Sequence, residues 1–308
     1  MSLFVKKPLD QILAQAADSE KGLKRTLGAG NLIALGIGAI IGAGLFVRTA
    51  AAAGQAAGPA VTLSFIVAAI GCAFAGLCYA EFASMIPIAG SAYAYSYVTM
   101  GELIAWIIGW ALIMEYALGA ATVSIAWSEY LNKLLGGAIP YEWCHSPMES
   151  FTDTAGIHHS GIMNAPALVI LLALTLLLIK GTQESAFVNM IIVFIKVAIV
   201  ILFIAIGWQF IKPENHTPYM IPEGTAAVAD QAGKVIADYS GWNKHGWGGV
   251  LGGAAIVFFA FIGFDAVSTA AQEAKNPKRD MPIGILGSLV VCTILYILFG
   301  HVLTGVAP

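Results

Sequence analysis

The glycine-rich stretch from Gly36 to Gly44, Gly-Ile-Gly-Ala-Ile-Ile-Gly-Ala-Gly, lies inside the first long apolar segment of the chain. Its four glycines weaken a helix, because each costs about 1 kcal/mol relative to alanine. In lipid, an unpaired backbone group costs several kcal/mol more. The stretch therefore predicts one of two things. Either the helix unwinds to bind a ligand in a protein-lined cavity, or Gly38 and Gly42 allow close packing against another helix. The sequence alone leaves both interpretations open.

The composition places the chain in a lipid bilayer. Hydrophobic residues make up 58% and charged residues 11%, and the mean hydropathy is +0.81; a soluble domain carries roughly 25% charge. Stretches of about 20 apolar residues mark seven candidate spans. They are Asn31–Val47, Pro59–Ile86, Leu103–Leu131, Ala165–Lys180, Ala186–Ile211, Gly249–Ala271 and Ile283–Val306. No basic tract indicates nucleic acid as a partner, so the lipid bilayer is the expected surrounding.

Positive charges indicate which span ends face the cytoplasm. Nine lysines and arginines precede the first span or follow the fourth or sixth, which puts them on one face: Lys6, Lys7, Lys21, Lys24, Arg25, Lys180, Lys275, Lys278 and Arg279. The opposite face carries five, in longer loops that also hold acidic residues: Arg48, Lys133, Lys212, Lys234 and Lys244. We therefore expect a multi-pass protein of the cell membrane with its N-terminus in the cytoplasm.

Residues 1–30 form the expected cytoplasmic segment before the first span. They contain no apolar core of roughly 7–15 residues, which excludes a cleavable signal peptide. Leu9, Ile12, Leu13 and Ala16 recur at helical spacing. This amphipathic stretch is therefore suited to lie along the membrane surface.

The spans fall into two groups, residues 31–211 and 249–308, separated by an outer loop at 212–248. Gly263 and Asp265 interrupt the sixth span, five spans after the glycine-rich first. Interrupted helices at corresponding places in two halves point to a transporter site. We interpret 31–211 as a first five-helix repeat and 249–308 as the start of a second, so the chain is expected to be cut short after about seven helices.

Ionisable residues inside the spans are the candidates for coupling. Lys196 lies near the middle of an apolar span, where a charge costs roughly 2.5–3.5 kcal/mol on insertion scales. Because desolvation favours the neutral form, such a lysine can take up and release a proton. Glu115 lies near mid-span and can face substrate, relay a proton or bond neighbouring helices. Asp265 can serve as a relay or cap the second half of a broken helix.

An unwound first helix would offer amides at one end and carbonyls at the other. Amides hold an anion and carbonyls hold a cation, so both together fit the zwitterion of an α-amino acid. His145, His158 and His159 lie in a loop, and their spacing does not match that of a metal-binding motif. No Ser-His-Asp set or pair of carboxylates occurs together on one span. We expect no metal, no cofactor and no enzymatic activity.

Several motifs resemble the amino acid–polyamine–organocation superfamily, and specifically its bacterial permeases similar to the cationic amino acid transporters. The resemblance runs from about Leu27 to the end of the chain. It rests on Gly36-Ile-Gly-Ala-Ile-Ile-Gly-Ala-Gly-Leu-Phe46, Tyr79-Ala-Glu-Phe82, Gly90-Ser-Ala-Tyr93, Gly101-Glu-Leu-Ile-Ala-Trp-Ile-Ile-Gly-Trp110, Phe258-Phe-Ala-Phe-Ile-Gly-Phe-Asp-Ala-Val-Ser-Thr-Ala270 and Asn276-Pro-Lys-Arg-Asp-Met-Pro-Ile-Gly284.

The resemblance implies an all-α membrane protein of the LeuT type, with inverted repeats and broken first and sixth helices. It implies a substrate carboxylate at the amides matching Ala43 and Gly44. It implies an ammonium at the carbonyls matching Ile40, Phe259, Ala260 and Ile262. We include Ile41 and Gly263, which lie in the same two breaks. Lys196 matches a fifth-helix lysine at a position that relatives use for sodium. Many members carry Thr or Ser at the position of Ala43; alanine keeps the backbone amide there and lacks the hydroxyl.

These observations favour a proton-coupled L-amino-acid permease that works by alternating access. A cationic amino acid carrier or exchanger, with Glu115 facing the substrate, is the alternative within transport. A membrane receptor or fragment that does not transport is the alternative outside it. The oligomeric state is open.

Overall fold

The computed structural model describes residues 5–10, 14, 25–152, 158–180, 182–229 and 235–307. Contacts divide the chain into two compact units, Met1–Trp110 with Val193–Pro308, and Ala111–Ile192. Ile12, Leu13 and Ala16, which carry the expected amphipathic segment, lie outside the described residues, so that expectation stays a prediction.

The first unit contains both apolar helices that the sequence predicts to be broken, and most of the buried apolar side chains. Its helices in chain order are α2 (Ala29–Ile40), the π-helix η1 (Gly44–Arg48), α3 (Thr49–Ala52), the π-helix η2 (Ala53–Ala57), η3 (Gly58–Ala60), α4 (Val61–Met85), α5 (Ser91–Thr99), the start of α6 (Glu102–Leu134), the end of α8 (Thr182–Gly207), η5 (Trp208–Phe210), η6 (Pro213–His216), η7 (Trp242–Lys244), α9 (Gly246–Val257), η8 (Phe258–Phe261), η9 (Phe264–Glu273) and α10 (Pro277–Val306). A short antiparallel hairpin, β3 (Val228–Ala229) with β4 (Val235–Ala237), precedes η7.

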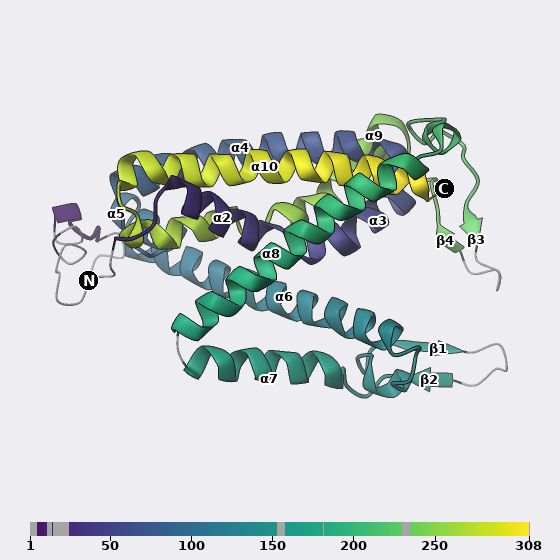
Figure 1. The fold of residues 1–308 in the computed structure, drawn as a ribbon, viewed down its shortest axis with the longest axis horizontal. Coiled ribbons are helices and arrows are strands. Elements are labelled where there is room, and N and C mark those ends of the chain that lie inside the picture. Colours follow the sequence, from purple (N-terminus) through teal and green to yellow (C-terminus); the bar gives the residue numbers. More distant parts are fainter. Residues whose placement is uncertain are drawn as a thin grey trace. The chain divides into compact units, whose positions relative to one another are not determined.

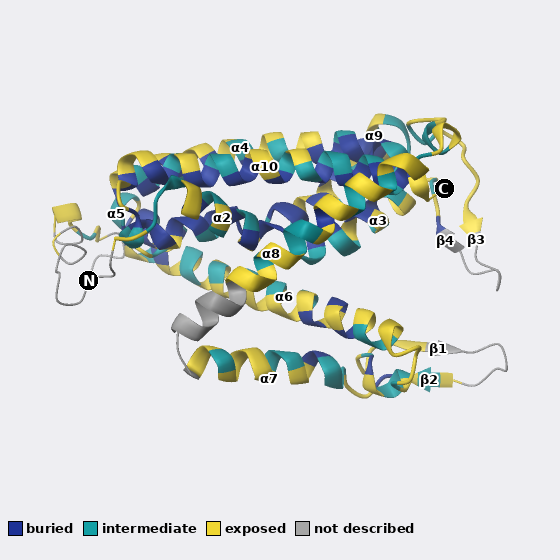
Figure 2. Ribbon diagram, viewed as in Figure 1, coloured by how far each residue is buried: buried dark blue, intermediate teal, exposed yellow. Residues whose placement is uncertain are grey.

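The core of this unit lies where α4 and α2 pack along α10 (Figures 1 and 2). Phe65 of α4, Phe261 of η8 and Tyr296 of α10 are fully buried. The ring centroid of Tyr296 lies 5.3 Å from that of Phe65 and 5.3 Å from that of Phe261. Tilted aromatic pairs at this separation add to the free energy of apolar burial. The cluster therefore fixes η8 against two long helices.

Five helical runs among the described residues are long and apolar enough to cross a membrane. They are Gly44–Met85, Glu102–Leu134, Met190–Phe210, Gly246–Glu273 and Pro277–Val306. Of the seven expected spans, the first is interrupted after Ile40, so that α2 has only 12 residues. The fourth forms α7 with the expected bounds but only 16 residues. The prediction of a mostly helical, multi-pass membrane protein is confirmed.

The second unit contains α6 from Ala111 onward, η4 (Tyr141–Trp143), the hairpin β1 (Ser150–Thr152) with β2 (His158–Ser160), α7 (Ala165–Lys180) and α8 up to Ile192. Many apolar side chains of α6 and α7 are exposed in this unit, which suits contact with lipid (Figure 2). The two short hairpins add to the expected all-α architecture without changing it.

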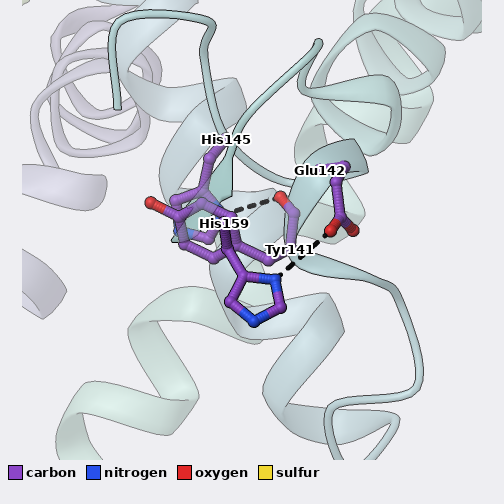
Figure 3. Close-up of polar contacts among 4 residues, drawn as sticks. All are labelled: Tyr141, Glu142, His145 and His159. Atoms are coloured by element: carbon purple, nitrogen blue, oxygen red, sulfur yellow. Dashed lines mark hydrogen bonds and ion pairs between the residues drawn. The ribbon is translucent and has the colours of Figure 1, made fainter. Parts of the chain in front are cut away.

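Polar contacts order the loop between α6 and α7 (Figure 3). The ring of His145 stacks on that of Tyr141 with centroids 3.8 Å apart. The Nδ1 atom of His159 lies 3.5 Å from Oε1 of Glu142. A bond from its own backbone N–H and the contact with His159 lower the pKa of Glu142. These histidines therefore have structural partners within the loop.

Candidate functional site

The predicted interruption of the first apolar helix is confirmed. Helix α2 ends at Ile40, and Ile41 is extended, with φ −71° and ψ 112°. The chain resumes helical geometry at Ala43, which directly precedes η1. Ile40, expected within the break, is instead the last helical residue. Because η1 begins at Gly44, the amides of its first turn have no acceptor within the helix. Those of Leu45 and Phe46 donate instead to the carbonyl oxygen of Gly42, at 3.1 and 3.4 Å.

Three of the four glycines in this stretch serve packing. A Cβ added at Gly36 would lie 2.4 Å from Oγ of Ser288, and one at Gly38 would lie 2.5 Å from Cγ2 of Val193. A Cβ at Gly44 would meet the backbone of the second broken helix, whereas one at Gly42 would meet nothing within 4 Å. The stretch therefore combines an unwound segment with close packing at Gly36, Gly38 and Gly44. Gly42, expected to pack together with Gly38, does not do so, and ligand binding at the unwound segment stays a prediction.

The sixth apolar helix is also interrupted. Helix η8 ends at Phe261, Ile262 has φ −57° and ψ 133°, and Gly263 has a left-handed φ of 111°. A Cβ at Gly263 would lie 2.8 Å from the carbonyl oxygen of Ala39. Glycine is required there for both reasons, since left-handed backbone disfavours other residues. Phe259 and Ala260, expected to be unwound, form part of a 3₁₀ turn instead.

The two interruptions meet in space. A Cβ at Gly44 would lie 2.3 Å from Cα of Ala260, so the two backbones touch there. The hydroxyl of Tyr296 in α10 lies 3.1 Å from the carbonyl oxygen of Ile40 and 2.9 Å from that of Ala260. Leu27, just before α2, pairs with Ala274, just after η9, as parallel strands do. The structure thus brings together the two predicted breaks.

Lys196 reaches the first break from α8. Its Nζ donates to the carbonyl oxygen of Ile41 at 2.6 Å and to that of Gly38. The structure therefore places Lys196 against the carbonyl groups at the end of α2, and its role in proton coupling stays a prediction.

Hydrogen bonds satisfy most of the carbonyl groups in the last turn of α2. A helix leaves its last four C=O groups without intrahelical partners. Here Ile37 accepts a bond from the N–H of Ile41 at 3.0 Å, Gly38 binds Lys196, and Ile40 binds Tyr296. Because a helix C-terminus carries a partial negative charge, this end favours a cation.

A charged side chain connects Phe259 of η8 to η1, the helix that follows the first break. The guanidinium carbon of Arg48, at the end of η1, lies 5.8 Å from the centroid of the Phe259 ring. Such a cation–π contact attracts the two segments. It therefore links η1 to η8 in addition to the contact between Gly44 and Ala260.

The acidic candidates belong to different units. Asp265 is 5% exposed and lies in the first turn of η9, where a carboxylate is favoured by the helix dipole. Glu115 lies on the part of α6 that belongs to the second unit and is half-buried. The roles expected for Asp265 and Glu115 in substrate binding or proton relay stay predictions.

Sequence reasoning missed Tyr296. It lies in the apolar helix α10 among other large residues, and nothing in the local pattern marks it. Only the three-dimensional structure shows that its hydroxyl reaches both breaks. A fully buried tyrosine needs a hydrogen-bond partner, which is the one signal that points to a polar neighbour.

Comparison with known proteins identifies relatives along the whole chain. The family model for amino acid permeases matches residues 27–308. The branched-chain amino acid permease BcaP of Bacillus subtilis (strain 168) is 46% identical over 308 residues, which cover 100% of this chain and 60% of the relative. The methylthioribose transporter of the same organism is 45% identical over 307 residues, with the same coverage. Human cationic amino acid transporter 4 is 35% identical over 312 residues, covering 98% of this chain and 43% of the relative. The chain thus spans about 60% of the length of its two bacterial relatives.

Proposed function

This chain belongs to the amino acid permease family, and we propose that it forms part of a proton-coupled carrier for L-amino acids that works by alternating access. The observation that carries the proposal is the meeting of two broken helices at Gly44 and Ala260. The family match and the permease and transporter names of the relatives support it. The carrier resides in the cell membrane with its N-terminus in the cytoplasm.

The two breaks offer complementary groups to a zwitterion. The amides of Ala43 and Gly44 lie at the start of η1, Ala43 directly before it and Gly44 as its first residue. A helix N-terminus binds an anion such as a carboxylate. The carbonyls of Ile40, Phe259, Ala260 and Ile262 take the ammonium. Ile41 and Gly263 supply the non-helical backbone that lets these groups face a ligand. Carboxylate and ammonium share one carbon in an α-amino acid, so neighbouring amides and carbonyls can bind both.

Lys196 couples this site to protons. While it is charged, its Nζ donates to Gly38 and Ile41 and supplies positive charge without a bound sodium ion. Loss of the proton weakens the hold on the first helix and leaves it free to change orientation. Proton uptake and release thereby accompany the conformational cycle.

Uptake into liposomes tests the proposal. The full-length gene product is reconstituted, and labelled L-leucine, L-alanine, L-arginine and methylthioribose are offered with and without an inward proton gradient. We expect saturable amino acid uptake that follows the proton gradient and does not respond to sodium. Absence of amino acid binding and uptake would contradict the proposal and favour a receptor without transport.

The names of the relatives favour a second candidate, a carrier for cationic amino acids. Competition separates the two candidates. If the chain belongs to a carrier for cationic amino acids, unlabelled L-arginine displaces labelled L-alanine more strongly than unlabelled L-leucine does. Methylthioribose lacks both the carboxylate and the ammonium. Its uptake in place of amino acids would show that the amides and carbonyls of the breaks do not select the substrate.

A further inference from the structure

The hydroxyl of Tyr296 lies between two backbone carbonyls from two different broken helices. It is 3.1 Å from the oxygen of Ile40 and 2.9 Å from the oxygen of Ala260. The Tyr296 side chain is fully buried, and its ring packs against Phe65 and Phe261. The ring is therefore held firmly, and the hydroxyl is presented to both helices at once.

The Tyr296 hydroxyl has fewer protons to donate than the two carbonyl oxygens can accept. A phenol has one O–H, whereas each carbonyl oxygen accepts up to two hydrogen bonds. At any moment, the hydroxyl can donate a full bond to only one of the two carbonyls. A buried carbonyl that lacks a partner raises the free energy of the protein. The carbonyl oxygens of Ile40 and Ala260 can therefore accept more hydrogen bonds than this hydroxyl supplies. A group with more N–H or O–H bonds could donate to both at once.

An ammonium group is such a donor. It carries three N–H bonds and a positive charge, and bonds to a charged donor are shorter and roughly twice as strong as neutral ones. The end of α2 favours positive charge on electrostatic grounds as well. An amino acid ammonium therefore binds Ile40 and Ala260 better than the Tyr296 hydroxyl does.

We propose that the Tyr296 hydroxyl donates to the carbonyls of Ile40 and Ala260 in place of a ligand's ammonium, and that its O–H bond rotates away from them, with the ring fixed, when an amino acid binds. This inference rests on the proposed function, because it requires an amino acid between the two breaks. It assigns Tyr296 as a positioning residue that stabilises the empty carrier, lowers its affinity and speeds release.

Tyr296→Phe tests the inference, because it removes the hydroxyl and keeps the ring between Phe65 and Phe261. In the empty variant both carbonyls lack this donor, and the ammonium restores it on binding. We expect the Kd for the amino acid that the parent binds best, among L-leucine, L-alanine and L-arginine, to fall about tenfold. The maximal exchange rate in liposomes should fall at the same time, since release becomes slower.

Two controls separate this effect from a general change in packing. Thr293→Val removes another hydroxyl from α10, one that donates to the carbonyl oxygen of Leu289 in the same helix at 2.7 Å, and it should leave Kd unchanged. The deaminated analogue of the ligand carries the carboxylate without the ammonium. Its Kd should be the same for the parent and for Tyr296→Phe.

The outcomes distinguish this inference from the function on which it rests. A parent protein that binds none of the three amino acids overturns both. A parent that binds, together with a folded Tyr296→Phe variant whose Kd is unchanged or higher, overturns the inference alone. If Tyr296→Phe does not fold, 3-fluorotyrosine at position 296 replaces it. That residue keeps the hydroxyl as a stronger donor, so Kd should rise, and an unchanged or lower Kd overturns the inference.

Discussion

The ammonium of Lys196 in α8 donates a hydrogen bond to the carbonyl oxygen of Ile41, 2.6 Å away and one residue beyond the end of α2. A second bond from the same atom reaches Gly38. The two bonds hold the C-terminal turn of α2 and the start of the break to a neighbouring helix. Any movement of the first helix at this point has to break them.

Lys196→Ala should therefore abolish accumulation of amino acid driven by a proton gradient, while binding of substrate persists. Alanine supplies neither the proton nor the two donors. The measurement is uptake by the reconstituted full-length protein at an inward proton gradient, alongside equilibrium binding of the same amino acid.

Lys196→Arg separates proton release from simple attachment of the helix. Arginine keeps the positive charge and the donors but does not lose its proton in proteins. Proton coupling predicts that this variant also fails to accumulate substrate. Normal accumulation by Lys196→Arg, or uptake by the parent that follows a sodium gradient, would contradict the assignment.

The sequence predicts much of this arrangement because glycine and charge are costly inside an apolar helix. The break after Ile40 and the break at Gly263 follow from that cost, and so does the expectation that Lys196 is not left as an unpaired charge. That its partners lie in the first helix does not follow from the cost. The sequence places Phe259 and Ala260 in the second break, whereas the structure shows them in a tight 3₁₀ turn before it. A break involves only the residues that cannot continue a helix, and the pattern does not mark where they begin.

Other features depend on contacts between segments far apart in the chain. Ser288 and Val193 lie where Gly36 and Gly38 leave room, and no local pattern links those pairs. Tyr296 bonds to residues 256 and 36 positions away. A tyrosine in an apolar helix looks the same in sequence whether its hydroxyl meets a broken helix or a single carbonyl. Only the fold distinguishes these cases.

Gly44→Val should abolish amino acid binding. Even a single added Cβ would lie 2.3 Å from Cα of Ala260, and backbone cannot shift as a flexible side chain can. The two breaks would be forced apart, and the amides of η1 would leave the carbonyls of η8. Equilibrium binding of labelled amino acid to the purified variant measures the effect.

Gly42→Ala is the matched control, because a Cβ at Gly42 meets nothing within 4 Å. It changes a glycine in the same stretch and should leave binding close to that of the parent. Equal binding by Gly44→Val and the parent would show that the close approach of Gly44 and Ala260 is not needed for the site.

Gly263→Ala should destabilise the protein by at least about 1–2 kcal/mol, the usual cost of left-handed backbone for a residue other than glycine. Its Cβ would also lie 2.8 Å from the carbonyl oxygen of Ala39, which adds a steric penalty. Thermal unfolding in detergent measures the loss as a lower Tm. Gly224 has a similar φ of 79° but open space around it, so Gly224→Ala isolates the backbone cost. A Tm for Gly263→Ala no lower than that for Gly224→Ala would show that the Ala39 contact relaxes freely.

Phe259→Ala should weaken amino acid binding several-fold without changing its pH dependence. The ring joins η8 to η1 through Arg48, a contact worth about 0.5–1 kcal/mol at an exposed place, and it borders the carbonyls that we assign to the ammonium. Lys196 and its two bonds remain intact in this variant, so proton coupling should persist. Arg48→Gln removes the cation and keeps the ring. If the ring itself walls the site, Arg48→Gln should keep more affinity than Phe259→Ala, as measured by binding across a range of pH. A pH profile that shifts in Phe259→Ala would instead place the ring in the coupling mechanism.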